Sequence, residues 1–201
     1  MTTLRIQAFS DGVFAILITI MVLYLRQPHG ATFHDLRSSL PSFFAYALSF
    51  VLLATYWNNH HHLLNVVKCI SPGLMWANNN LLFWLSLVPF VTAWMAENGF
   101  ARDTVIVYGA ACVMGAVAYT VLQTLIVAAH GPNSALRRAL GSDLKPKLSA
   151  SGYVVAIPLA FVSRAAAVAV FVVVALSWLI PDRRLQTFID SRGGPELAVA
   201  D

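Results

Sequence analysis

The chain has 201 residues, of which 58% are hydrophobic and only 11% are charged, and its formal net charge is +4. A soluble domain contains about 25% charged residues, so this composition excludes a soluble globular protein and indicates an integral membrane protein. The excess of positive charge does not point to nucleic acid, because the basic residues lie in short segments between apolar runs, where they set membrane topology.

Six apolar stretches predict six transmembrane helices. They cover roughly residues 4–25, 41–64, 74–95, 104–129, 148–162 and 165–180. Most of them reach the ~20 residues that a hydrocarbon core of ~30 Å requires, but the fifth is short and contains Pro158. We therefore expect an all-α membrane protein with a six-helix transmembrane domain over residues 1–182 and a polar tail over 183–201.

The first stretch is unusual because Arg5 and Asp11 stand near the start of a segment that is otherwise apolar. A carboxylate inside a membrane helix costs about 3 kcal/mol on insertion scales, so it persists where it has a partner or lines a polar path. The first helix is therefore the leading candidate for a functional element, and the rest of the chain must supply the partner of Asp11.

Beyond Asp11, a stripe along one face of the first helix carries Gly12, Ile16, Thr19 or Ile20, and Leu23, at spacings of about one helical turn. From the residues alone, this stripe is typical of a buried hydrophobic helix with a threonine bonded to its own backbone. A pore would need several copies of the helix around one axis, and the chain has no internal repeat, so only oligomerisation could supply them.

The distribution of lysine and arginine predicts the orientation. With six spans, the two termini and the second and fourth loops hold nine basic residues, whereas the other loops hold four. Cytoplasmic loops carry the excess of basic residues, so both termini are expected in the cytoplasm of a multi-pass protein of the cell (inner) membrane.

This orientation brings three polar segments to a similar depth. They are Ser10 and Asp11 on the first helix, Asn58 to His62 at the end of the second, and Asn78 to Asn80 early in the third. Such groups are unstable against lipid, so they are expected to satisfy one another inside the bundle. The candidate partners of Asp11 are Arg5, the histidines and the asparagines, of which Asn80 is the most plausible.

The run His60, His61 and His62 raises three alternatives. Consecutive histidines point about 100° apart on a helix, whereas metal ligands usually stand three or four residues apart, so a metal site is disfavoured. Hydrogen-bonded histidines that brace the first helix are favoured. A proton-coupled transporter or proton conductor that uses Asp11 and His60–His62 stays open, because histidine titrates near neutral pH. No catalytic motif supports an enzyme, and no cofactor is expected.

Several motifs together resemble the transmembrane protein 175 family. They are the signature R-x-x-x-F-S-D at Arg5–Asp11, a Trp-x-x-His pattern at Trp57–His60, asparagines early in the third helix, and Pro181-Asp182 after the last helix. This family consists of potassium channels unrelated to the voltage-gated type. Since the chain carries one six-helix repeat, it is similar to the prokaryotic members, which assemble as homotetramers.

The resemblance implies roles for individual residues. Four copies of the first helix would line the pore, with an isoleucine constriction at Ile16, further apolar layers at Ile20 and Leu23, and a selectivity layer at Thr19. Potassium would permeate with weak preference over sodium, because no carbonyl filter or acidic ring is present. The resemblance also implies a brace that holds the first helix, formed by Arg5, Phe9, Ser10, Asp11, His60, His61 and Asn80; which of the three histidines contacts that helix stays open.

Overall fold

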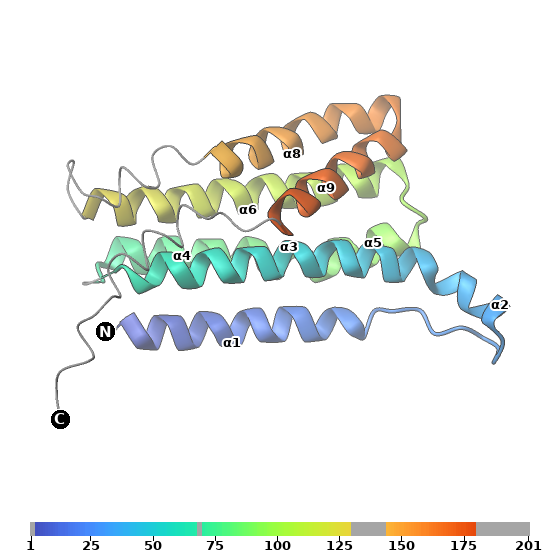
Figure 1. Cartoon of the computed structure of the whole chain (residues 1–201), viewed down its shortest axis with the longest axis horizontal. Coiled ribbons are helices and arrows are strands. Elements are labelled where there is room, and N and C mark those ends of the chain that lie inside the picture. The colour runs from blue at the N-terminus through green and yellow to red at the C-terminus, as the bar shows by residue number, and fades with distance from the viewer. Residues whose placement is uncertain (1–2, 68–69, 130–143, 180–201) are drawn as a thin grey trace.

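The computed structural model describes residues 3–67, 70–129 and 144–179, and every regular element among them is helical (Figure 1). The elements are α1 (Thr3–Val22), α2 (Phe33–Leu36), η1 (Arg37–Ser39), α3 (Leu40–Asn65), α4 (Pro72–Ser86), α5 (Val88–Glu97), α6 (Arg102–Ala129), α8 (Leu144–Val162) and α9 (Arg164–Leu179). The all-α prediction is confirmed for this part of the chain. The tail over 183–201 lies outside the described residues.

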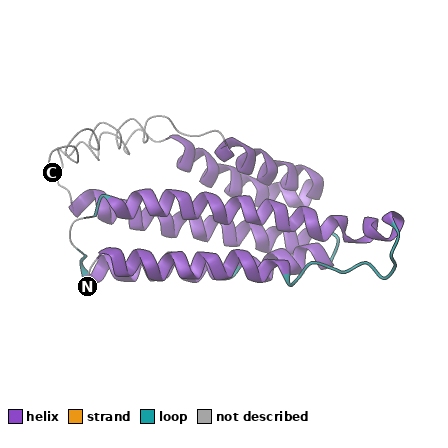
Figure 2. Cartoon of the chain, turned by 60° about the horizontal axis from the view of Figure 1, so that its bottom comes forward, coloured by secondary structure: helices purple, strands orange, loops and turns teal. Residues whose placement is uncertain are grey.

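The long helices run side by side in one bundle, with α1 at one edge and the α8–α9 pair at the opposite edge (Figures 1 and 2). Helix α1 packs against α3, α4 and α5, and α6 packs against α4, α5 and α8. Apolar side chains such as Leu53, Leu81 and Leu122 are fully buried between the helices. The edge position leaves one side of α1 without a neighbour among the described residues.

Within the described residues, four helical segments are long and apolar enough to cross a membrane: Thr3–Val22, Phe33–Asn65, Pro72–Glu97 and Arg102–Ala129. Two shorter apolar segments, Pro146–Val162 and Arg164–Trp178, follow them. The shorter pair packs on the long helix α6, and α9 also contacts α3, so both are shielded on one side by the bundle.

The third predicted stretch, 74–95, is divided between α4 and α5 at Leu87. Pro89 stands in the first turn of α5, where a proline is compatible with a helix start because that N–H has no partner within the helix. Close by, the hydroxyl of Thr92 donates to the Val88 carbonyl at 2.6 Å and lies 2.7 Å from the hydroxyl of Ser49 on α3. Buried hydroxyls are therefore paired beside this break.

The other helix ends differ from the predicted bounds by a few residues. Helix α1 ends at Val22 rather than at residue 25, and Leu23 begins a turn in which its N–H donates to the Ile20 carbonyl at 3.1 Å. Helix α8 begins at Leu144, four residues before the prediction, and continues through Pro158. The short helix α2 was not predicted; Thr32 and Asp35 form a capping box at its start.

Candidate functional site

Helix α1 has two different faces. The face toward α3, α4 and α5 carries its buried side chains, which recur every three or four residues: Ile6, Ser10, Phe14, Leu17 and Met21. The opposite face includes Ile16, which is 62% exposed, and the exposed Thr19, and it continues to Leu23, which is 78% exposed and lies in the turn directly after α1. Because an α-helix repeats every 3.6 residues, this second set forms a continuous strip along the helix.

A polar cluster joins the packed face of α1 to α3 and α4. It consists of Ser10, His60 and Asn78, one from each helix, and all three side chains are at most 2% exposed. The Asn78 amide donates to the Ser10 hydroxyl at 3.1 Å, and His60 Nε2 lies 2.7 Å from Asn78 Oδ1, which suits an imidazole with its proton on Nε2. Asn78 thus donates to Ser10 and accepts from His60 at the same time.

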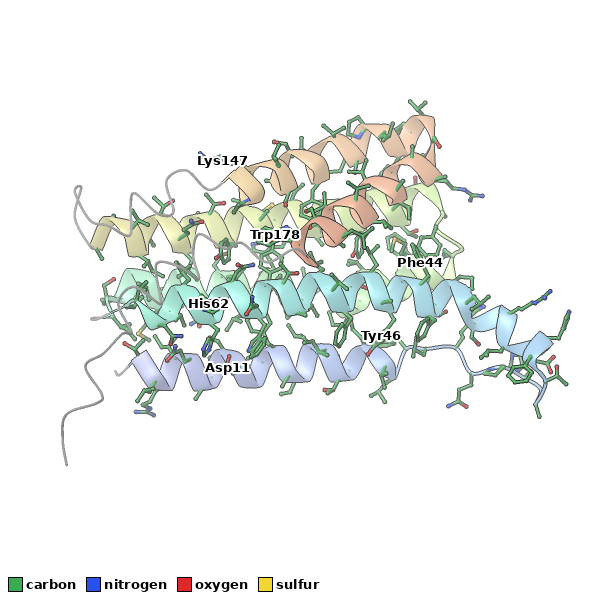
Figure 3. The ribbon with its side chains drawn as sticks, in the orientation of Figure 1. Asp11, Phe44, Tyr46, His62, Lys147 and Trp178 are labelled. Atoms are coloured by element: carbon green, nitrogen blue, oxygen red, sulfur yellow. The ribbon has the colours of Figure 1, made fainter. Side chains whose placement is uncertain are left out.

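Asp11 contacts a residue that we did not predict as its partner. The indole N–H of Trp57 on α3 donates to Asp11 Oδ1 at 2.9 Å. In Figure 3, Asp11 lies on α1, which runs beside α3. The residue pattern offered only a weak signal for this contact: Trp57 stands one helical turn before His60 and His61, so all three lie near one face of α3.

Two further hydrogen bonds tie the start of α1 to the end of α3. The Gln7 amide donates to Asn65 Oδ1 at 2.6 Å, and the Thr3 hydroxyl donates to the Val67 carbonyl at 3.2 Å. Arg5 is exposed and forms no ion pair with Asp11 or any other residue in the described part of the chain. The first three turns of α1 are therefore fixed on their packed face, whereas Arg5 and Phe9 are exposed.

The asparagine that reaches the cluster is Asn78, and not Asn80 as we predicted for this contact. Asn78 shares the buried face of α4 with Ala77, Leu81 and Leu85. Asn80 is exposed, because two residues along a helix correspond to a rotation of about 200°. The structure also distinguishes the histidines: His60 is fully buried in the cluster, whereas His61 and His62 are half-buried, with the His61 ring 6.2 Å from the Trp57 ring.

Among the described residues, no group of three or more histidine, cysteine, aspartate or glutamate side chains is arranged to hold a metal ion. The arrangement of the cluster is instead that of interhelical hydrogen bonds. Such bonds contribute about 1 kcal/mol each in membrane proteins. Its chemistry is that of a brace between three helices.

On the exposed strip of α1, the hydroxyl of Thr19 donates to the Ala15 carbonyl at 2.8 Å and lies 3.1 Å from the Ile16 carbonyl. This is the backbone-bonded geometry expected for a threonine in a helix. Because the hydroxyl proton is committed to the backbone, the oxygen lone pairs are oriented away from the helix and suit a cation or its water. Ile16 lies one turn earlier on the same strip, and Ile20 is half-buried beside it.

The chain is similar to known proteins. Residues 5–89, which include most of α1 and all of α3 and α4, match the family described as endosomal/lysosomal potassium channel TMEM175. A relative from Chryseobacterium sp. (strain P1-3), named Potassium channel HX13_20290, is 46% identical over 186 residues, which are 92% of this chain and 97% of the relative.

Two further matches extend the comparison. The crystal structure of a homologue of the lysosomal potassium-selective channel TMEM175 from Chamaesiphon minutus superposes with a TM-score of 0.74 at 30% identity, covering 88% of this chain and 96% of that one. A human protein named endosomal/lysosomal proton channel TMEM175 is 28% identical over 111 residues, 49% of this chain and 22% of that protein. The chain therefore belongs to the TMEM175 family, whose members are ion channels and not enzymes.

Proposed function

We propose that this chain forms a homotetrameric, potassium-permeable channel in which four copies of α1 line a central pore. The observation that carries the proposal is the exposed strip of α1, which bears Ile16, Thr19 and Leu23 on the side opposite to the packed face. Helix α1 lies at the edge of the bundle, so this strip is available to an axis shared with other copies (Figure 1). One copy of the helix per chain makes a closed ring of subunits necessary.

In this assembly, Ile16 forms the narrowest apolar ring, and Ile20 and Leu23 form further apolar layers. A hydrophobic constriction closes a pore by excluding water from it. The constriction and the Thr19 layer are separated by three residues, which is about 4.5 Å along a helix axis. A cation that passes the isoleucine ring therefore meets four hydroxyl oxygens within one helical turn.

The selectivity that follows is weak. A ring of hydroxyl oxygens replaces only part of the hydration shell of an ion, unlike the stacked rings of backbone carbonyls in the selectivity filter of voltage-gated potassium channels. Potassium loses its hydration shell more readily than sodium, so it is preferred, but modestly. The bias of basic residues supports an orientation with both termini in the cytoplasm. In this proposal the channel lies in the inner membrane and passes potassium.

The substitution Thr19→Ala tests this assignment. In liposomes that contain the purified protein, we expect the ratio of potassium to sodium permeability to fall toward one, because the hydroxyl oxygens of the selectivity layer are removed. Thr124→Ala on α6 is the matched control, since the Thr124 hydroxyl is also exposed and also donates to its own helix, at 2.7 Å from the Thr120 carbonyl. Equal permeability ratios in both variants and the unmodified channel would contradict the pore assignment.

A second candidate function is proton conduction through the polar cluster, and two observations favour keeping it. Asp11 and the buried His60 lie on adjacent helices, in two neighbouring hydrogen-bonded groups: Asp11 with Trp57, and His60 with Asn78. The human relative is also named a proton channel. In this alternative, a proton passes along the side chains between α1 and α3 rather than along the exposed strip.

The variant Asp11→Asn separates the two candidates. If Asp11 carries protons, flux driven by a pH gradient is lost in a variant that still elutes as the native assembly. If Asp11 only holds α1 against Trp57, less of the variant assembles correctly, but the fraction that does assemble keeps its permeability. Gel filtration and a pH-gradient flux assay on the same preparation give both readouts.

A further inference from the structure

A cavity lies between α3, α6, α8 and α9, on the side of the bundle away from α1. Its volume is about 40 Å³, and it is partly open to the outside of the bundle. A single water needs roughly 10–15 Å³. The cavity therefore has room for a few waters or for one small organic molecule.

The wall of this cavity is mainly apolar and aromatic. Leu52, Ala116 and Ala175 contribute aliphatic surface, and Trp178 lies where the end of α9 approaches α3 (Figure 3). None of the lining side chains is charged. Because a charged ligand in such a site would lose its hydration without gaining a counter-charge, the wall selects an uncharged occupant.

Several polar groups that line the cavity lack a hydrogen-bond partner among the described residues. The strongest case is Tyr153 on α8, which is only 5% exposed and whose hydroxyl makes no hydrogen bond there. On α3, the hydroxyls of Thr55 and Tyr56 also make no hydrogen bond within the described residues. The Asn59 amide donates to the Thr55 carbonyl at 2.8 Å, but the side-chain oxygen of Asn59 accepts no hydrogen bond there.

In the described chain, the fully buried polar side-chain atoms without a partner are Ser39 Oγ and His60 Nδ1, and neither lines this cavity. The hydroxyls at the cavity therefore face its open volume, where their donors and acceptors are available to an occupant. An occupant that both donates and accepts, and that is otherwise apolar, would satisfy these groups and the wall together. We propose that the cavity is a binding site for a small, uncharged amphipathic molecule that bears a hydroxyl group.

The test uses 2,2,2-trichloroethanol as the probe, because it is a small uncharged alcohol and quenches tryptophan fluorescence on contact. Trp178 borders the cavity and serves as the reporter. With the full-length protein in detergent, we expect a saturable component of quenching, which disappears in Trp178→Phe. The analogue 1,1,1-trichloroethane has no hydroxyl, and its apparent affinity should be about fivefold weaker, the value of one net hydrogen bond.

Two variants of the wall complete the test. Ala116→Leu should remove the saturable component by filling the cavity, whereas Ala110→Leu, at an exposed position of the same helix, should leave it unchanged. Tyr153→Phe keeps the ring and removes the hydroxyl, so we expect about fivefold weaker binding of the alcohol and no change for trichloroethane. Tyr46→Phe, outside this cavity, is its control.

The proposal is overturned if quenching is linear in probe concentration and equal in all variants, since the probe would then only partition into detergent and the cavity would take only water. It is also overturned if the alcohol and trichloroethane bind equally. If Ala116→Leu fails to elute as folded protein, the comparison of the two probes on the native chain and on Tyr153→Phe decides the question alone.

Discussion

The variant Ile16→Asn is expected to leak potassium much faster than the unmodified channel. In the proposed assembly, four copies of Ile16 form the ring that excludes water from the pore, and four asparagines would keep the ring wet. Each ~1.4 kcal/mol removed from the barrier to permeation raises the rate about tenfold. With four side chains replaced at once, we expect at least a tenfold increase in the initial rate of potassium efflux from liposomes.

A matched control separates this effect from general damage by a polar substitution. Val173 on α9 is 65% exposed, close to the 62% of Ile16, and lies at the opposite edge of the bundle from α1. Val173→Asn should therefore leave the efflux rate near that of the unmodified channel. If Ile16→Asn assembles normally and its efflux rate does not rise, Ile16 is not at the constriction.

The helices themselves were predictable because apolar length is a strong signal in a membrane protein. The break at Leu87 was not, since a proline at a helix start and a proline in a continuous span give the same local pattern. The fifth helix was predicted too short because its first four residues, which include Lys145 and Lys147, look like loop. Only packing against α6 and α9 accounts for that helix.

The depth of the polar cluster was predictable, and the predicted brace named Ser10 and His60, but it did not name Asn78. Topology brings the polar segments of three helices to one level, and the structure has Ser10, His60 and Asn78 in contact there. The choice of Asn78 over Asn80 depends on how α4 is rotated about its own axis. A helix that is apolar on all sides carries little information about that rotation.

The same limit explains why Trp57 was not predicted as the partner of Asp11. Tryptophan in a membrane protein is usually read as an interfacial anchor, and the donor role of its indole N–H becomes visible only when α1 and α3 are placed side by side. Conversely, the exposed strip of α1 consists of residue types that, judged from the sequence alone, would be assigned to a buried core. The structure distinguishes them from core because no other helix of the described chain covers them.

The brace makes the second large prediction: Asn78→Leu should destabilise the subunit strongly. Leucine has the same number and branching of side-chain heavy atoms as asparagine, but it leaves the Ser10 hydroxyl and His60 Nε2 buried without partners. Each buried polar group that loses its partner costs about 1–3 kcal/mol, so we expect a loss of roughly 2–6 kcal/mol. The measurement is thermal unfolding in detergent, with gel filtration to follow assembly.

Asn80→Leu is the informative control, because it makes the same chemical change two residues away on the exposed face of α4. No side chain of the described chain loses a partner there, so the thermal midpoint of the subunit should stay close to that of the native protein. An equal loss in both variants would show that the buried position of Asn78 is not what stabilises α1. If only Asn78→Leu is destabilised, α1 is held by its packed face, and its other face is free to line the proposed pore.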